Sequence, residues 1–259
     1  MKGFCFTVDD NIWCLKELSQ GNYESIFSHP YLAVYKRLHE RFGVKVQLNL
    51  FYEENGFDLS QMTARFRVEW EDNADWLKLS YHALHHDITS YENVTYKTMY
   101  EECAKTNREI IRFAGEASLA KSTTIHFCKC SGEGISALKE CGYEGLLGLY
   151  GTQEQLRISY GLSEEACKRL QGGELLKVNG VWHLGIDIVL NRFCTQEILK
   201  MLDALKTHEV VSVMIHEQFF YPHYRSYQAD FEEKLAKTFE KLLTFGYESR
   251  FAEEIFLNK

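Results

Sequence analysis

The chain has 259 residues, a length that suits one large α/β domain or two small ones. Hydrophobic residues make up 45% of it and charged residues 25%, which is the composition of an ordinary globular protein. The net charge of −8 offers no basic surface for nucleic acid or anionic lipid, and no apolar run reaches the ~18 residues that suggest a membrane span. We therefore expect neither nucleic-acid nor membrane partners.

The start of the chain and its cysteines indicate a compartment. Met1 and Lys2 lead directly into a strand-like segment, without the apolar stretch of a secretory leader. The eight cysteines are scattered and form no Cys-x-x-Cys pair, and several fall on apolar faces where a thiol packs as a small hydrophobic group. Reduced thiols of this kind predict a cytoplasmic protein.

In the first part of the chain, segments with strand and helix patterns alternate. Strands are expected over residues 3–8, 44–51, 77–81, 123–127 and 143–149, and helices over 12–18, 30–42, 60–73, 96–113 and 133–141. Strands that alternate with helices through short connections are typical of a parallel sheet covered by helices.

The middle of the chain interrupts this alternation. A strand over 156–160 and a helix over 163–170 precede a β-hairpin over 175–184, in which Asn179 and Gly180 form the two-residue turn. We interpret residues 151–184 as an insertion on the main fold.

The alternation then resumes to the end of the chain. Further strands are expected over residues 185–189 and 210–216, and further helices over 195–206 and 230–245. The resulting count of about seven core strands predicts an α/β fold, a deformed seven-stranded (β/α) barrel, in a single domain over residues 1–259. No glycine-rich nucleotide-binding fingerprint follows the first strand, so a bound dinucleotide or nucleoside triphosphate is not expected.

Two acidic residues, Asp9 and Asp10, follow the first strand directly. A pair of carboxylates at the end of a buried strand is unfavourable unless it binds a cation or a proton, because like charges repel at close range. One of the two could instead cap the helix that follows, but this alternative leaves the other unexplained.

Histidines follow the third strand. His82 and His86 are four residues apart, which on a helical turn would place both imidazoles on one face and let them hold one metal ion. His85 competes with His86 for the role of second ligand, and an ordinary polar loop rich in histidine is the alternative to a metal site.

Other strands deliver similar residues. His126 and His216 lie near the carboxyl ends of their strands, and Asp187 lies within a strand among apolar neighbours. Because the carboxyl ends of barrel strands meet at one rim, these side chains are expected to converge with Asp9, Asp10 and His82. His126, His85 and Asp187 are thus possible additional members of the site.

Three short segments in this order resemble those of the polysaccharide deacetylases of carbohydrate esterase family four. Phe6-Thr-Val-Asp-Asp10 is similar to the family's Thr-Phe-Asp-Asp, His82-Ala-Leu-His-His86 to its His-Ser/Thr-x-x-His, and Met214-Ile-His216 to its Leu-x-His. The resemblance spans nearly the whole chain and implies a divergent branch of the family. It implies that Asp10, His82 and His86 hold the metal, with Asp9 as general base and His216 as general acid.

The sequence also departs from the family pattern. The arginine-bearing segment Arg-Pro-Pro-Tyr-Gly is absent, and Phe127-Cys-Lys-Cys-Ser-Gly132 occupies its place. In the family that arginine orients the catalytic aspartate, so its absence leaves the role of Asp9 open.

The expected function is hydrolysis of an amide C–N bond with a divalent metal, zinc first and iron, cobalt, nickel or manganese as alternatives. The resemblance implies removal of N-acetyl groups from a small or oligomeric carbohydrate. A metallohydrolase acting on another small amide and a carbohydrate-binding barrel without catalysis are the alternatives.

Overall fold

The computed structural model describes residues 2–151 and 155–257 of the chain. Its main sheet is parallel, with strand order β10–β11–β1–β2–β5 and with β12 beside β1. The strands of this sheet are β1 (Gly3–Asn11), β2 (Val46–Phe51), β5 (Leu77–Ala83), β10 (Ile188–Val189), β11 (Val210–His216) and β12 (Glu248–Ser249).

A second sheet has the order β6–β7–β9–β8. Its strands are β6 (Ser122–Thr123), β7 (Gly145–Gly148), β8 (Leu176–Val178) and β9 (Val181–Gly185). The two sheets share one interrupted strand, because β9 pairs with β7 and runs through two residues into β10, which pairs with β11. On the other side, the Ala120 N–H donates to the Leu79 carbonyl at 2.8 Å. The predicted deformed (β/α) barrel is therefore confirmed.

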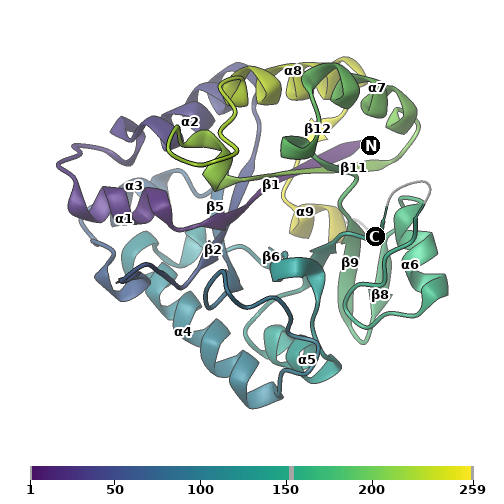
Figure 1. The fold of residues 1–259 in the computed structure, drawn as a ribbon, viewed down its shortest axis with the longest axis horizontal. Coiled ribbons are helices and arrows are strands. Elements are labelled where there is room, and N and C mark those ends of the chain that lie inside the picture. The colour runs from purple at the N-terminus through teal and green to yellow at the C-terminus, as the bar shows by residue number, and fades with distance from the viewer. Residues whose placement is uncertain (1, 152–154, 258–259) are drawn as a thin grey trace.

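Helices surround this barrel (Figure 1). α2, α7 and α8 cover one side, whereas α4 and α5 cover the opposite side. The helices are α1 (Trp13–Gln20), α2 (Pro30–Phe42), α3 (Arg67–Asp72), α4 (Tyr96–Ala114), α5 (Gly132–Glu140), α6 (Glu164–Gln171), α7 (Thr195–Leu205), α8 (Phe231–Thr244) and α9 (Ala252–Phe256). No described helix has the length and apolar character needed to cross a membrane.

Local sequence accounts for the ends of these helices. α2 begins at Pro30, whose fixed φ suits the first helical position, and ends at Gly43 with a φ of 65°. The Thr95 side chain accepts a hydrogen bond from the Thr98 N–H at the start of α4. These boundaries match the predicted ones because capping residues are short-range signals.

The hairpin in the middle of the chain has the predicted turn. Asn179 and Gly180 have φ values of 52° and 81°, the left-handed conformations that a two-residue turn requires, and β8 pairs with β9 in antiparallel fashion. β9, which we expected inside the insertion, also pairs in parallel with β7 and so belongs to the barrel. Residues 152–154 of the insertion lie outside the described residues, and its separation from the main domain stays a prediction.

Several predicted elements are wrong in part. The strand expected over 185–189 is interrupted, since Gly185 ends β9 and β10 begins at Ile188. The strand expected over 123–127 ends at Thr123, and a 3₁₀ turn, η4 (His126–Cys128), follows it. Residues 156–160 contribute one isolated bridge, between Gly151 and Leu156, instead of a strand. The helix expected over 60–73 is only α3, preceded by a 3₁₀ turn, η2 (Leu59–Gln61), that Asp58 caps.

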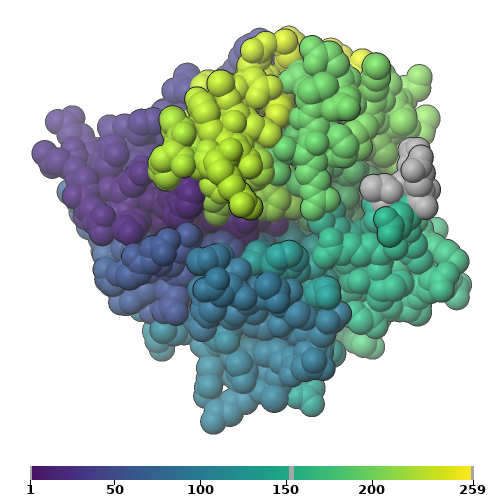
Figure 2. Space-filling view, in the orientation of Figure 1, coloured from purple at the N-terminus to yellow at the C-terminus, as the bar shows by residue number. Residues whose placement is uncertain are grey.

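The barrel interior is partly polar. An apolar cluster that includes Cys5, Leu147, Ile255 and Phe256 lies where α9 meets the strands. Polar side chains are also buried among the strands: Gln47, Asn49, Ser80 and Ser122. Segments far apart in the chain meet on one face of the molecule, where the purple N-terminal part, the teal middle and the yellow-green part near the C-terminus adjoin (Figure 2).

Candidate metal centre

Asp10 reaches the rim of the barrel through a β-bulge at the end of β1. Val8 pairs with Leu48 and Asn11 with Leu50, so β1 has one residue more than β2 between these pairs. Asp10 adopts a φ of 65°, a left-handed conformation that is unfavourable for most residues with a side chain. The bulge interrupts the alternation of side chains along β1, so the side chains of two consecutive aspartates can both face the same rim.

His82 lies on a second bulge, in β5. Leu50 pairs with Tyr81 and Phe51 with Ala83, so His82 is the extra residue opposite β2. Bulges of this kind redirect a side chain and are common beside active sites. Because β5 continues through Ala83, the helical turn that we expected at His82 is wrong.

His126 enters from the loop after β6. The two residues that follow it, Phe127 and Cys128, have φ values of 57° and 55°. Residues of the segment that we expected as an insertion hold this unusual backbone in place: Arg157 Nη2 donates to the Phe127 carbonyl at 2.5 Å, and the Tyr160 N–H donates to the Cys128 carbonyl at 3.0 Å. Strain of this kind persists only where the surroundings stabilise it.

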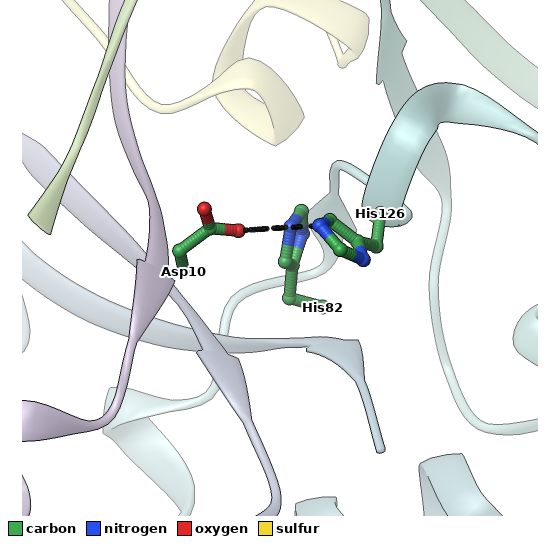
Figure 3. Close-up of side chains that lie close together, drawn as sticks. All are labelled: Asp10, His82 and His126. Carbon is green, nitrogen blue, oxygen red and sulfur yellow. Dashed lines mark hydrogen bonds and ion pairs between the residues drawn. The ribbon is translucent and has the colours of Figure 1, made fainter. Parts of the chain in front are cut away.

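Asp10, His82 and His126 point toward one another (Figure 3), and one ligand atom of each lies within 4.8 Å of the others. Asp10 Oδ1 is 3.1 Å from His82 Nε2 and 3.7 Å from His126 Nε2. All three are largely buried, with 19%, 2% and 13% of their side chains exposed. One carboxylate oxygen and two imidazole nitrogens form a donor set suited to zinc or another divalent transition metal.

Both histidines are oriented through their Nδ1 atoms. His82 Nδ1 bonds to the Thr124 carbonyl, and His126 Nδ1 bonds to the Ile88 carbonyl at 2.8 Å. A carbonyl can only accept, so each Nδ1 carries the hydrogen and each Nε2 is directed to the shared site. This arrangement is usual for metal-binding histidines, and the three residues fit a bound divalent metal.

The charges of the three groups are coupled. Burial opposes ionisation of Asp10, but its hydrogen bond with His82 and the charges of the nearby histidines lower its pKa to about 2. Burial would lower the pKa of His82, whereas the charges of Asp9 and Asp10 raise it above the ordinary value. Burial and the charge of His82 lower the pKa of His126 to about 4. The group therefore combines an ionised Asp10 carboxylate with a neutral His126 imidazole, and a bound cation would take the place of the proton that the neighbouring carboxylates favour on His82.

Asp9 and His216, the expected base and acid, lie near the carboxyl ends of neighbouring strands and pair in the register of β1 with β11. Asp9 is buried, and its Oδ1 accepts a hydrogen bond from Asn49 Nδ2 at 2.6 Å. Burial raises the pKa of Asp9, and the charges of His82 and His216 oppose this rise. His216 Nδ1 bonds to Asn191 Oδ1 at 2.8 Å, which directs its other nitrogen away from Asn191.

The structure does not bring His86 to this cluster. Its side chain is 50% exposed, and its Nε2 lies 3.1 Å from Asp87 Oδ1. His85 is likewise peripheral, with Nδ1 3.8 Å from Asp87 Oδ2. In the structure it is His126, and not the expected His86, that lies beside Asp10 and His82, because His82 lies in a strand and the next turn carries His86 outward.

Asp187 lies apart from the rim as well. It lies in the interruption between β9 and β10, and its Oδ2 accepts the N–H of Ser212 in β11 at 2.8 Å. Ser212 precedes His216 by four residues, a separation of about 13 Å along a strand. Burial raises the pKa of Asp187 to about 7. In this geometry Asp187 bonds to β11 and does not contact the metal cluster.

Our sequence interpretation missed Asn49, Asn191 and Glu217. Glu217 is buried and accepts hydrogen bonds from the backbone N–H groups of Ile12, Trp13 and Cys14 at 2.7–2.9 Å, which fixes the start of α1. Asn49 could have been found, because Gln47 and Asn49 alternate with apolar residues in 46–51 and so share one face.

No protein-family model matches the sequence, and no curated protein matches it. Solved structures do match in fold. The Bc1960 peptidoglycan N-acetylglucosamine deacetylase aligns with a TM-score of 0.56 and 12% identity, over 98% of this chain and 88% of that chain. A family 4 acetyl xylan esterase from Clostridium thermocellum, in complex with cobalt, aligns with a TM-score of 0.50 and 13% identity, over 99% and 91% of the two chains.

A third similar structure is the pseudoenzyme BA3943 of the same esterase family, from Bacillus anthracis. It aligns with a TM-score of 0.53 and 12% identity, and the match covers 98% of this chain but only 64% of the pseudoenzyme chain. The fold implied by the short sequence segments is therefore confirmed: this chain has the fold of the carbohydrate esterase family 4 polysaccharide deacetylases, a fold found with and without enzymatic activity.

Proposed function

We propose that this protein is a metal-dependent hydrolase that removes acetyl groups, most simply N-acetyl groups, from a carbohydrate. The observation that carries the proposal is the convergence of Asp10, His82 and His126, with both histidines oriented through backbone carbonyls. A structural cluster would not need two imidazoles to direct the same nitrogen at one carboxylate oxygen. These residues would hold a divalent cation, which supplies Lewis acidity toward water and the acyl oxygen.

The remaining steps belong to side chains of this chain. Asp9 accepts a proton from the water as it attacks the acyl carbon, and it is the buried carboxylate next to Asp10 in sequence. His216 gives a proton to the leaving nitrogen through Nε2, while Asn191 holds Nδ1. A positioned general acid or base contributes typically 10²–10⁴-fold in rate.

Aromatic residues beside the centre suit a sugar substrate. The Phe127 ring lies 4.4 Å from the His126 ring, and 46% of Phe127 is exposed. The Phe219 ring lies 6.1 Å from the His216 ring. The flat, apolar face of a pyranose ring stacks favourably on aromatic surfaces, so these two rings favour a carbohydrate over a small aliphatic amide.

The test is acetate release by the full chain. We expect zinc-loaded protein to release acetate from N-acetylglucosamine oligomers, with O-acetylated xylan as a parallel substrate to distinguish amide from ester hydrolysis. Removal of the metal by a chelator and the variant His82→Ala should each abolish the reaction. A metal-saturated protein that releases acetate from neither substrate would contradict the proposal.

A carbohydrate-binding protein without catalysis is the second candidate. It is supported by the absence of the Arg-Pro-Pro-Tyr-Gly segment and by the presence of a pseudoenzyme among the similar structures. In that case the zinc-loaded chain would bind N-acetylglucosamine oligomers in calorimetry without releasing acetate.

A further inference from the structure

We propose that Asn49 is the positioning residue for Asp9, and that a hydrogen-bonded relay across the barrel interior fixes Asn49 in turn. This inference rests on the proposed function, because it concerns the residue that takes a proton from water. Asn49 belongs to β2, not to either acidic or histidine segment of the sequence, and it has no partner role in the metal cluster.

The bond between the two residues is short and buried. Asn49 Nδ2 donates to Asp9 Oδ1 at 2.6 Å, and both side chains are almost completely excluded from solvent. The bulge in β1 creates the contact, since Asn49 is the β2 residue between Leu48 and Leu50, opposite the two aspartates. A fixed donor on one oxygen sets the plane of the carboxylate, and so the direction of the second oxygen.

Asn49 is itself held from below. Its Oδ1 accepts a hydrogen bond from Gln47 Nε2 at 2.7 Å, so the amide cannot rotate without losing a bond at each end. Gln47 Oε1 accepts from Ser122 Oγ at 2.9 Å, and Gln47 Nε2 also donates to the Ser122 carbonyl at 3.0 Å. β2 and β6 are therefore tied together beneath Asp9.

The relay continues to the far end of the barrel. Ser122 Oγ lies 3.0 Å from Oε2 of Glu253, a residue of α9, and Glu253 Oε1 accepts from Lys78 Nζ at 3.1 Å. Polar groups buried in this way generally add less stability than well-packed apolar side chains. A connected series that begins at the candidate base is accordingly better explained by positioning than by stability.

The test is a double-mutant cycle on the full, zinc-loaded chain with Asn49→Leu and Asp9→Asn. Leucine has the same branching of side-chain heavy atoms as asparagine but no hydrogen-bond donor. If Asn49 acts through Asp9, Asn49→Leu lowers kcat at least about 10-fold, because small displacements of a catalytic group reduce rates strongly. KM and zinc content stay unchanged, and adding Asn49→Leu to Asp9→Asn has no further effect on kcat.

Thr7→Val is the matched control. Thr7 is buried in β1 two residues before Asp9, and its hydroxyl has no hydrogen-bond partner among the described residues. The variant Thr7→Val removes a polar group that is buried to a similar degree as Asn49, and we expect it to leave kcat unchanged. If Asn49→Leu does not fold, Gln47→Leu tests the same relay and should lower kcat in the same direction.

The outcomes separate the two proposals. An active wild-type protein in which the effects of Asn49→Leu and Asp9→Asn multiply independently, or in which Asn49→Leu keeps the wild-type kcat, overturns the positioning role alone. A zinc-loaded wild-type protein that releases no acetate overturns the hydrolase function and the positioning role together.

Discussion

Asp10 Oδ1 and His82 Nε2 lie 3.1 Å apart because both residues occupy β-bulges against the same strand, β2. In regularly paired strands, side chains alternate strictly between the two faces of the sheet. Each bulge interrupts this alternation and changes the direction of one side chain at the rim. The centre is therefore built from irregularities in two strands that β2 separates. His126 completes it from a loop with two consecutive left-handed residues.

The first prediction distinguishes the two candidates for the second histidine ligand. His126→Ala should lower zinc affinity by at least about 10-fold, because it removes a ligand that faces Asp10, whereas His86→Ala should leave zinc affinity unchanged. Zinc content after dialysis and competition with a chromogenic chelator measure both. Loss of zinc in His86→Ala with retention in His126→Ala would restore the ligand set that the sequence implies.

The second prediction concerns stability. Zinc at 100 times its Kd should stabilise the folded protein by about 2.7 kcal/mol, which for a chain of this size raises Tm by roughly 5–10 °C. Differential scanning calorimetry with and without a chelator checks the shift. The variant His82→Ala should show no zinc-dependent shift, and an equal shift in that variant would place the metal elsewhere.

The third prediction concerns the expected acid. His216→Ala should lower kcat by about 10²–10⁴-fold while zinc content stays at the wild-type level, because His216 lies outside the metal cluster. Asn191→Leu should lower kcat less, since it removes only the bond that orients His216 Nδ1. Steady-state kinetics together with metal analysis separates these effects. Loss of zinc in His216→Ala would make His216 a ligand instead of an acid.

The fourth prediction concerns folding. Glu217→Ala should reduce the free energy of unfolding by about 3 kcal/mol or more, because it leaves three backbone N–H groups at the start of α1 without their acceptor. Chemical denaturation measures the change. Glu233→Ala, an exposed residue paired with Lys237 on α8, is the control and should leave the unfolding midpoint unchanged. Equal midpoints for both variants would show that water replaces Glu217.

The sequence allowed the barrel and part of the centre to be predicted, for a physical reason. Parallel strands must place their carboxyl ends at one rim, so finding Asp10, His82 and His216 after three such strands was sufficient to group them. Pro30 and Gly43 also allowed the ends of α2 to be predicted, because the effect of a capping residue extends over only a few residues.

The second ligand could not be predicted because it depends on backbone register. Spacing alone favoured His86, on the assumption of a helical turn at His82, but one bulge keeps the chain extended through Ala83. The sequence indicated His126 only as a possible member of the site. The residue types in 123–127 do not indicate that Phe127 and Cys128 adopt positive φ values. Contacts with distant residues, here Arg157 and Tyr160, decide that conformation.

These contacts connect residues 157–160 to the loop that carries His126, one of the three candidate metal ligands. Tyr160 holds both sides of the loop, since its hydroxyl accepts the Ile125 N–H at 3.1 Å and its own N–H donates to the Cys128 carbonyl. The segment that departs most from the regular strand–helix alternation is thus also the scaffold of one imidazole. Substitutions in residues 157–160 can therefore change the metal affinity of the candidate centre through the backbone of the His126 loop. Asp10, His82 and His126 would all stay the same.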